Sequence, residues 1–334
     1  MVTMQRGQLG YGLWGRAPWV GLLAIVIMLP LIIQRPFFHH VMIMLALYAT
    51  MGEAWNLVGG YLGYVSFGHA VFFGIGAYTT AVLFANFNVN PWVGMVIGGV
   101  VAVGAAAIIA YPCFRFGLRG HYFAIATMAF GEIVRVLFLN WPYVGGATGF
   151  MVPLHKDSFA LLQFHQSKLP YYYIALAMAV ATLVIMKLII DSKLGYYLRA
   201  IREDEEAAEC LGVPTSLVKH VAFYISAFIV ALAGALYGQY QLYFDPPMVF
   251  DLMVSVNMVL ITLFGGRGTI AGPLLGAAIF VPLREYTRAW LGGGGRGLDY
   301  MILGLLLMVI VVSQPKGVLG FLERIVRRKA YEKG

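Results

Sequence analysis

A few polar and titratable residues interrupt long apolar segments of this sequence, where a charged group is costly in lipid and often functional. Glu132 and Arg135 are three residues apart, so on a helix they share a face and can pair. We expect a structural ion pair there, with a gate or a contact to a zwitterionic solute as the alternative. The candidates for lining a solute pathway are Glu53, Asn56, Ser66, His69, Glu132 and Asn257.

Simpler explanations exist for most of these residues. Glu53 lies on one helical face with Asn56, toward the expected cytoplasmic end, where snorkelling or helix capping would account for it. A buried, hydrogen-bonded histidine is more common than a ligand contact, and this applies to His69 beside Ser66. Asn257 fits an interhelical hydrogen bond better than a substrate contact.

The sequence carries no pattern typical of catalysis, so we predict a chain that is not an enzyme. It has neither a Ser-His-Asp order nor paired carboxylates, and the adjacent His39 and His40 lack further ligands at metal-binding spacing. Cys113 and Cys210 match no zinc or redox motif. A phosphate loop of the Gly-x-x-x-x-Gly-Lys-[Ser/Thr] type is also missing, so we expect no bound ATP, cofactor or metal.

The composition indicates a membrane protein. The chain has 334 residues, of which 60% are hydrophobic and 11% are charged. Soluble domains carry about 25% charged residues. The mean hydropathy of +0.80 agrees with this interpretation. We therefore expect one all-α transmembrane bundle over residues 1–334.

The apolar segments predict about ten spans, because a membrane-crossing helix needs about 20 mostly apolar residues. Glycines interrupt the second and third segments and the eighth and ninth, and the eighth is short. The first is interpreted as a retained helix and not as a cleaved signal peptide. The predicted spans cover residues 18–33, 40–58, 62–85, 92–114, 122–141, 171–190, 218–243, 252–264, 270–290 and 299–313.

Basic residues predict the orientation of these spans. With ten spans both termini lie on one side, and that side collects Arg115, Arg119, Lys193 and many others. Cytoplasmic loops carry such an excess, so both termini should be cytoplasmic. The basic tail over residues 314–334 fits anchoring at a lipid surface better than nucleic-acid binding. The other side receives Arg35, Lys156, Lys168 and Arg296.

Two glycine-rich stretches resemble each other, one starting at Leu57-Val58-Gly59-Gly60 and the other at Leu263-Phe264-Gly265-Gly266. Glycine-interrupted segments point to a solute pathway in transporters. Plain helix packing is the simpler explanation for any single glycine. An internal repeat and shared composition both remain open.

The polar stretch over residues 191–220 is the most informative part of the chain. Residues 199–211 favour a short, charged amphipathic helix on the cytoplasmic side, which should stop at Gly212. Such a helix can dock in a groove of a partner, although a solvated loop has the same composition. The longest outer connection, residues 141–169, is either a periplasmic docking surface or a simple covering loop.

The stretch resembles the cytoplasmic coupling helix of ABC importer permeases, and in particular the permease family of branched-chain amino acid importers. Gly60-Tyr61-Leu62-Gly63, Ser66-Phe67-Gly68-His69-Ala70 and Gly265-Gly266-Arg267-Gly268-Thr269 also match this family, whose LivM-like subunit is the more similar of its two permeases. The matching coupling residues are Arg199, Arg202, Glu203, Asp204, Glu205, Ala207, Ala208 and Gly212.

The resemblance implies the rest of the assembly. A second, LivH-like permease would pair with this chain in the bacterial inner membrane. Two ATP-binding subunits would bind beneath and hydrolyse ATP, and a periplasmic solute-binding protein would deliver a branched-chain or related amino acid. The alternative function is an ion-coupled secondary transporter, which would need intramembrane carboxylates but no coupling helix.

Overall fold

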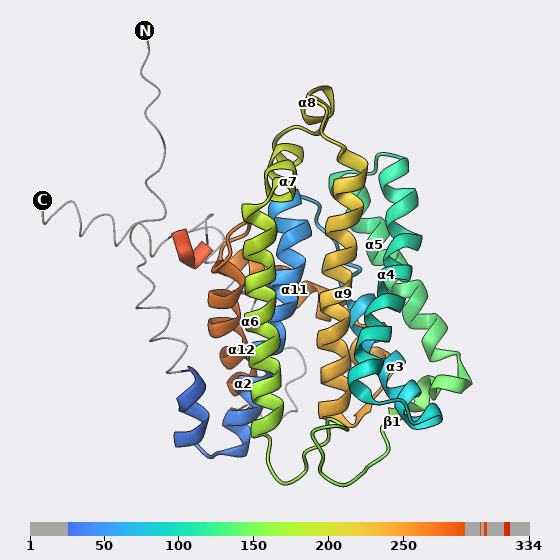
Figure 1. Ribbon diagram of the computed structural model, residues 1–334, viewed down its shortest axis with the longest axis vertical. Coiled ribbons are helices and arrows are strands. Elements are labelled where there is room, and N and C mark those ends of the chain that lie inside the picture. The colour runs from blue at the N-terminus through green and yellow to red at the C-terminus, as the bar shows by residue number, and fades with distance from the viewer. Residues whose placement is uncertain (1–25, 291–300, 302–303, 306–316, 321–334) are drawn as a thin grey trace, which may run out of the picture.

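The computed structural model describes residues 26–290, 301, 304–305 and 317–320. Figure 1 shows a bundle of long, roughly parallel helices with one very small sheet. The main elements are α2 (Pro36–Asn56), η1 (Leu57–Leu62), α3 (His69–Phe87), α4 (Pro91–Arg115), α5 (Gly120–Leu139), α6 (Leu169–Asp191), α7 (Lys193–Glu203), α8 (Glu205–Cys210), α9 (Thr215–Gln241), α10 (Pro246–Val249), α11 (Leu252–Gly265) and α12 (Gly272–Trp290).

Seven segments of the described residues are long and apolar enough to cross a membrane. They confirm an all-helical, polytopic bundle. Half of the predicted first span and most of the tenth lie outside the described residues. The ninth is α12, and Arg284, Glu285 and Arg288 make it more polar than the rest. The candidate spans are Pro36–Leu62, His69–Phe87, Pro91–Arg115, Gly120–Leu139, Leu169–Asp191, Thr215–Gln241 and Pro246–Gly265.

Small residues bring the central helices close together. α3 packs against α4 and α9, while α2 packs against α6, α9, α11 and α12. A Cβ atom on Gly76 would lie 2.0 Å from the carbonyl oxygen of Ala231, and one on Gly234 would lie 1.9 Å from that of Phe73. Glycine therefore permits the close crossing of α3 and α9, as expected for helices packed in a membrane.

The bundle has two distinct ends. α7 and α8 project from one, called here the α8 end (Figure 1). The other, called here the β1 end, carries β1 (Phe150–Met151) and β2 (Tyr243–Phe244), which pair antiparallel. The short helices η2 (Pro142–Val144) and η3 (Gly146–Thr148) precede β1.

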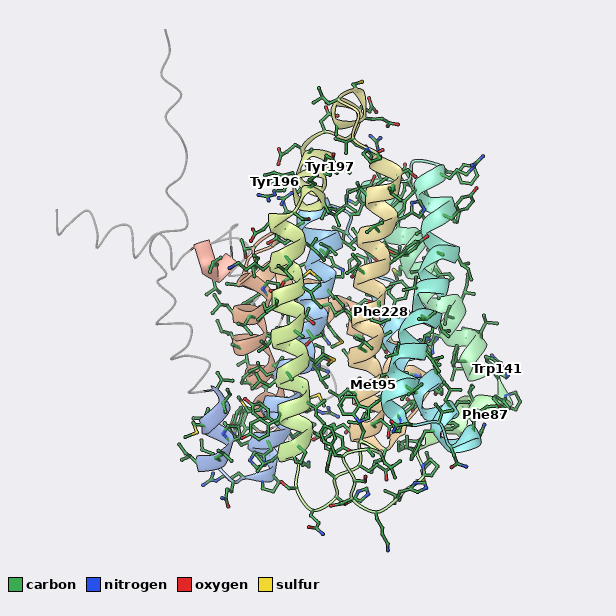
Figure 2. All side chains as sticks on the ribbon, viewed as in Figure 1. Phe87, Met95, Trp141, Tyr196, Tyr197 and Phe228 are labelled. Atoms are coloured by element: carbon green, nitrogen blue, oxygen red, sulfur yellow. The ribbon has the colours of Figure 1, made fainter. Side chains whose placement is uncertain are left out.

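Aromatic side chains mark the two ends of the bundle. Phe87 and Trp141 lie toward the β1 end, and Tyr196 and Tyr197 lie on α7 at the opposite end (Figure 2). Phe87, Trp141 and Tyr196 are all exposed. Tryptophan and tyrosine are enriched at both membrane–water interfaces. The spacing of these side chains therefore fits a bundle that crosses a bilayer from one end to the other.

Candidate functional site

The charged segment at the α8 end is two helices, and not the single helix that was expected over residues 199–211. α7 begins at Lys193. Ser192 is its N-cap, and the Ser192 side chain accepts a hydrogen bond from the Leu194 N–H. The chain then turns at Asp204. The Asp204 Oδ1 atom accepts hydrogen bonds of 3.0 Å from the N–H groups of Glu206 and Ala207, which makes Asp204 the N-cap of α8. Aspartate competes for these donors and so divides the helix.

The outer part of this segment is well exposed. Gly212 follows α8 with a φ of +86°, a left-handed conformation suited to glycine, so the predicted stop is confirmed. Leu211 is 86% exposed although it is apolar. An open groove beside it is lined by residues of α8, of the connection after it and of the start of α9, among them Glu209, Val213, Leu217 and His220. This tip offers an apolar side chain and a groove to a partner.

Glu205 points inward and joins three other elements. Its Oε1 atom accepts a 2.5 Å hydrogen bond from the Lys219 Nζ of α9. Its Oε2 atom accepts a 2.6 Å bond from the Tyr64 hydroxyl and lies 3.2 Å from the Nε of Arg119. The Glu205 and Lys219 side chains are 9% and 4% exposed. The α8 segment is therefore locked to α9, to the connection after η1, and to the start of α5.

The charge state of Glu205 follows from these contacts. Burial of the carboxylate opposes its ionisation. The hydrogen bonds from Lys219 and Tyr64, with the positive charges of Lys219 and Arg119, outweigh that effect and hold the pKa of Glu205 below its ordinary value. Burial and the bond to Glu205 raise the pKa of the Tyr64 hydroxyl. Glu205 is thus an ionised hydrogen-bond acceptor, and the Tyr64 hydroxyl is one of its hydrogen-bond donors.

Arg202 joins α7 to a break in the first described span. Its Nη1 atom donates a 2.7 Å hydrogen bond to the carbonyl oxygen of Gly60. Gly60 lies in η1, where the backbone of Leu57–Leu62 has π-helical form. π-Helical turns are rare in proteins, and those that occur are often located at functional sites. A charged side chain of the extramembrane segment therefore holds the irregular backbone of a span.

The two glycine-rich stretches meet at this break. The Asn56 Nδ2 atom donates to the carbonyl oxygen of Thr269 at 2.9 Å, and the Asn56 Oδ1 atom accepts from the Gly268 N–H at 2.8 Å. A Cβ atom on Gly60 would lie 1.9 Å from the Asn56 Oδ1 and 2.6 Å from the Gly268 nitrogen. Irregular backbone at membrane depth survives when it is buried in protein, and Asn56 satisfies it here.

His69 is the first residue of α3, which follows η1 in the chain, and it is fully buried. Its Nδ1 and Nε2 atoms lie 3.0 Å and 2.9 Å from the hydroxyl oxygens of Ser66 and Ser226. The Ser226 hydroxyl donates to the carbonyl oxygen of Ala54, so the His69 Nε2–H donates to Ser226 and Nδ1 accepts from Ser66. Both ring nitrogens are satisfied within the protein, in agreement with the simpler explanation of this residue.

Glu53 and Asn257 are buried in the bundle. Glu53 is 1% exposed, so snorkelling toward water, one of the two simpler explanations for this residue, does not account for it. Neither of its carboxylate oxygens meets a donor in hydrogen-bond geometry among the described residues, although Asn56 lies close by. A buried carboxyl group without a partner is costly, and Glu53 is therefore an unusual feature of the span.

Glu132 and Arg135 form the expected pair on α5. The Arg135 Nε donates to Glu132 Oε2 at 2.9 Å, and Arg135 Nη2 bonds the other carboxylate oxygen. The Glu132 side chain is 58% exposed, so the pair lies on the outer face of a span. A single charge at the centre of a membrane helix costs about 2.5–3.5 kcal/mol. Water or another protein must therefore cover this pair.

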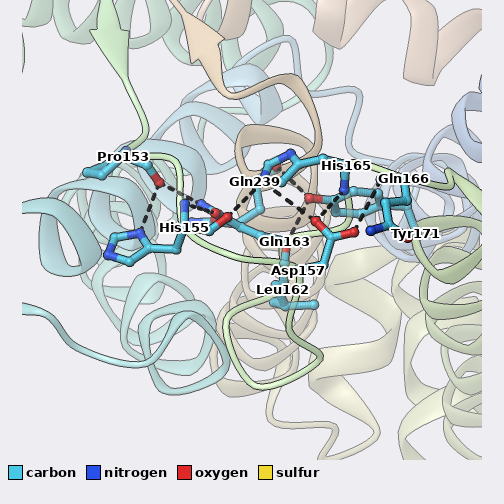
Figure 3. A network of polar contacts seen from close by, with 9 residues as sticks. All are labelled: Pro153, His155, Asp157, Leu162, Gln163, His165, Gln166, Tyr171 and Gln239. Carbon is cyan, nitrogen blue, oxygen red and sulfur yellow. Dashed lines mark hydrogen bonds and ion pairs between the residues drawn. The ribbon is translucent and has the colours of Figure 1, made fainter.

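The connection of residues 141–169 forms a cap at the β1 end (Figure 1), and polar contacts join several of its residues (Figure 3). The Gln163 side chain, which is fully buried, accepts from the His155 N–H at 2.6 Å and donates to the carbonyl oxygen of Pro153 at 2.7 Å. Asp157 accepts hydrogen bonds from the N–H groups of His165 and Gln166, and these hold its pKa below the ordinary value. These hydrogen bonds join residues up to ten positions apart within the connection.

The coupling and pathway candidates divide into groups that sequence patterns do not separate. Asn56, Ser66 and His69 gather around η1, whereas Glu132 lies apart on α5. Among the coupling candidates, Glu203, Asp204, Ala207 and Gly212 are exposed, Ala208 is buried, and Arg202 and Glu205 bond inward. Arg199 donates to the carbonyl oxygens of Ile190 and Gly195 and so joins α6 to α7.

Several residues of these hydrogen-bond networks could not be predicted from the sequence. Tyr64, Lys219 and Ser226 complete the networks of Glu205 and His69, but they sit in apolar surroundings without a motif. In α12, Glu285 lies 3.8 Å from the His40 ring, and Arg284 donates to the Tyr48 hydroxyl. A lysine at the fifth position of a long apolar helix is the signal that marks Lys219 in advance.

Candidate spans with a broken helix, tied to a charged segment outside them, define a polytopic membrane protein of the transporter class. The family model for the permease component of branched-chain amino acid transport systems matches residues 37–311. The chain belongs to this family.

The similar proteins carry names of the same kind. The high-affinity branched-chain amino acid permease LivM of Salmonella typhimurium is 29% identical over 322 residues, which cover 90% of this chain and 74% of the relative. LivH of Escherichia coli is 25% identical over 82% of this chain and 91% of its own length. A probable LivM of Methanocaldococcus jannaschii is 23% identical, covering 84% of this chain and 92% of that protein. No solved structure matches the chain significantly.

Proposed function

We propose that the chain is one of two related permease subunits of a binding-protein-dependent ABC importer for branched-chain or related amino acids. The hydrogen bond from Arg202 to Gly60 carries this proposal, because it links an extramembrane segment to the irregular part of a span. An importer whose ATPase is a separate chain needs such a link. The relatives named LivM and LivH supply the substrate class and the expected pairing.

The orientation follows from the distribution of basic residues. The α8 end holds Arg115, Arg119, Lys193, Arg199, Arg202, Lys219 and Arg267, whereas the β1 end holds Arg35, Lys156, Lys168 and Arg288, which lies near His40. Short cytoplasmic loops carry an excess of lysine and arginine. The α8 end is therefore cytoplasmic, the β1 end is periplasmic, and the protein resides in the bacterial inner membrane.

The α7–α8 segment acts as the coupling element. Its exposed tip, with Leu211 and the groove beside α8, docks on an ATP-binding subunit. Glu205 prevents the segment from moving independently of α9, because two cations and a hydroxyl hold its carboxylate. Closure of the ATP-binding subunits therefore moves α7–α8 as one unit, and Arg202 passes the movement to η1.

The remaining partners occupy other surfaces. A second, LivH-like permease completes the pathway, two ATP-binding subunits hydrolyse ATP, and this chain has no catalytic role. The folded cap of residues 141–169 receives the solute-binding protein. Buried hydrogen bonds of Gln163 give that cap a fixed shape before it meets a partner, which favours docking without a large ordering cost.

A second candidate function is an ion-coupled secondary transporter. The buried, unpartnered carboxyl group of Glu53 favours it, since such carriers use intramembrane carboxylates to bind ions. This reading gives no role to the exposed tip around Leu211. It predicts solute uptake by the chain alone, driven by an ion gradient.

Reconstitution distinguishes the two functions. The chain is purified with its LivH-like partner, with or without the ATP-binding subunits, and placed in liposomes with leucine and the solute-binding protein. We expect leucine uptake only when the ATP-binding subunits and ATP are present. Uptake by the chain alone under an ion gradient, unaffected by ATP, would overturn the importer proposal.

A further inference from the structure

α5 presents a broad face that the described elements leave open. The helix makes limited contacts with α3, α4, α10 and α11, and it lies at one edge of the bundle (Figure 1). Its exposed side chains recur every three or four residues, so they form one continuous face. They are Tyr122, Ile125, Met128, Ala129, Glu132, Ile133, Val136 and Leu137.

A comparison with α4 shows what is unusual about this face. Most exposed residues of α4, such as Val96, Val100 and Ile108, are apolar, as lipid requires, and the exposed Arg115 is the last residue of the helix. The face of α5 has the same character except for Glu132. At a rise of 1.5 Å per residue, Glu132 lies ~18 Å from the first residue of α5 and ~10 Å from its last, well inside the span. Lipid is therefore an unsuitable neighbour for the α5 face.

The charged pair on this face offers both signs to a ligand. The fork of Arg135 bonds both oxygens of Glu132. The Glu132 side chain is 58% exposed and that of Arg135 is 27% exposed, so each can reach a further partner. Asp251 also interacts electrostatically with Arg135. It caps α11, where its side chain accepts a 2.6 Å hydrogen bond from the Met253 N–H.

We propose that the open face of α5 borders a water-filled pathway and that Glu132 and Arg135 bind a zwitterionic α-amino acid there. This inference rests on the proposed importer function and specifies its solute class. The ammonium group of the solute binds the Glu132 carboxylate, and its carboxylate binds the Arg135 guanidinium as a bidentate partner. One internal ion pair is replaced by two, without proton transfer or a change of net charge.

This exchange sets a specificity that an apolar pathway lacks. A neutral solute of the same shape, such as 4-methylpentanamide, has no charges to offer in place of the internal pair. The apolar side chain of leucine lies against Met128, Ala129 or Ile133, which flank Glu132 on the same face. The pathway therefore passes zwitterions and excludes neutral amides.

Thiol labelling tests whether this face is wet and holds the solute. Cys113 and Cys210 are first replaced by serine, and Ala129→Cys is then introduced one turn from Glu132. Val100→Cys on the apolar face of α4 is the control, since each position lies ~15 Å from the β1 end of its helix. We expect a water-soluble maleimide to label position 129 but not position 100, and we expect leucine to slow the labelling while 4-methylpentanamide does not. An unlabelled position 129, or labelling that leucine leaves unchanged, would overturn the proposal.

Charge variants separate binding from a purely structural ion pair. In the reconstituted importer, Glu132→Gln and Arg135→Gln should each raise the KM for leucine by about tenfold or more, because each removes a charge-assisted contact. The double variant E132R/R135E restores an internal pair but reverses the orientation in which a zwitterion binds. It should recover thermal stability without recovering the KM.

Failure of the solute-binding proposal and failure of the importer proposal give different results. A double variant that recovers both stability and KM, or single variants with unchanged KM, would overturn the solute-binding role while the wild-type importer still works. Absence of ATP-dependent leucine uptake by the wild-type assembly would instead contradict the importer function itself.

Discussion

The Arg202 guanidinium donates a 2.7 Å hydrogen bond to the carbonyl oxygen of Gly60, across 142 positions of the sequence. On the other side of the same turn, Asn56 bonds the backbone of Gly268 and Thr269. The irregular turn η1 is therefore held between an extramembrane helix and the connection from α11 to α12. These hydrogen bonds connect α7 with η1, and η1 with the backbone between α11 and α12.

The buried position of Glu205 predicts a large loss of stability on truncation. Glu205→Ala leaves the Lys219 ammonium buried without its carboxylate partner. Breaking one partner of a buried pair costs about 3–5 kcal/mol in the free energy of unfolding. Glu206→Ala is the control, because Glu206 is 82% exposed and its 3.4 Å pair with Arg119 should contribute less than about 1 kcal/mol. Thermal unfolding in detergent compares the two variants. Equal losses would contradict the buried network.

The same residue predicts a dependence of stability on pH. The pKa of Glu205 is lower in the folded protein than its ordinary value of 4.5. Its contribution to stability is therefore complete above pH 4.5 and is lost as the pH falls through the folded pKa. Thermal midpoints recorded from pH 7 down to pH 3 should fall more steeply for the wild type than for Glu205→Gln. Parallel curves for the two proteins would show that Glu205 is not responsible.

The close packing at the break predicts that Gly60 tolerates no side chain. In Gly60→Ala, the new Cβ meets the Asn56 Oδ1 and the Gly268 nitrogen at distances that require backbone movement. We expect the two hydrogen bonds of Asn56 to be lost, at a cost of about 1–3 kcal/mol. Gly104→Ala on the exposed side of α4 is the matched control, because a Cβ there meets nothing within 4 Å.

That control should be neutral or slightly stabilising, since alanine is the better helix former by about 1 kcal/mol. Thermal midpoints measure both changes. Leucine uptake should fall only in Gly60→Ala, because only that variant displaces η1. If both glycine variants behave alike, the break is not a packed functional element.

Features with a local cause could be predicted from the sequence. Apolar length predicted the helical bundle, Gly212 predicted the end of the charged segment, and the three-residue spacing predicted the pair of Glu132 and Arg135. Each depends on the chain within one or two turns of the residue. The family resemblance also depends on several short local motifs, and the match of the family model to residues 37–311 confirms it.

Features that depend on distant partners could not be predicted. Glu205 looks like a surface charge until Lys219 and Tyr64 approach it from other elements. The partners around η1 are also distant in sequence: Arg202 bonds Gly60, and the backbone near Thr269 bonds Asn56, which directly precedes η1. The division at Asp204 is a different case, because a capping aspartate acts locally: the prediction of one helix over 199–211 depended on good helix formers and on the absence of proline and glycine, and it did not consider Asp204 as an N-cap.

The coupling ratio of an Arg202 variant tests the central claim most directly. Arg202→Ala removes the bond to Gly60, whereas the control Arg115→Ala removes an exposed arginine that bonds Tyr111, four residues earlier in the same helix. The measurement is leucine imported per ATP hydrolysed by the reconstituted importer, with the amount of co-purified ATP-binding subunit recorded for each variant.

A hydrogen bond from a charged group contributes about 1.5–3 kcal/mol, so its loss should lower the ratio by about tenfold in Arg202→Ala. ATP hydrolysis and subunit binding should persist, and Arg115→Ala should match the wild type. An unchanged ratio in Arg202→Ala would contradict the account, because η1 would then respond to ATP hydrolysis without its link to α7.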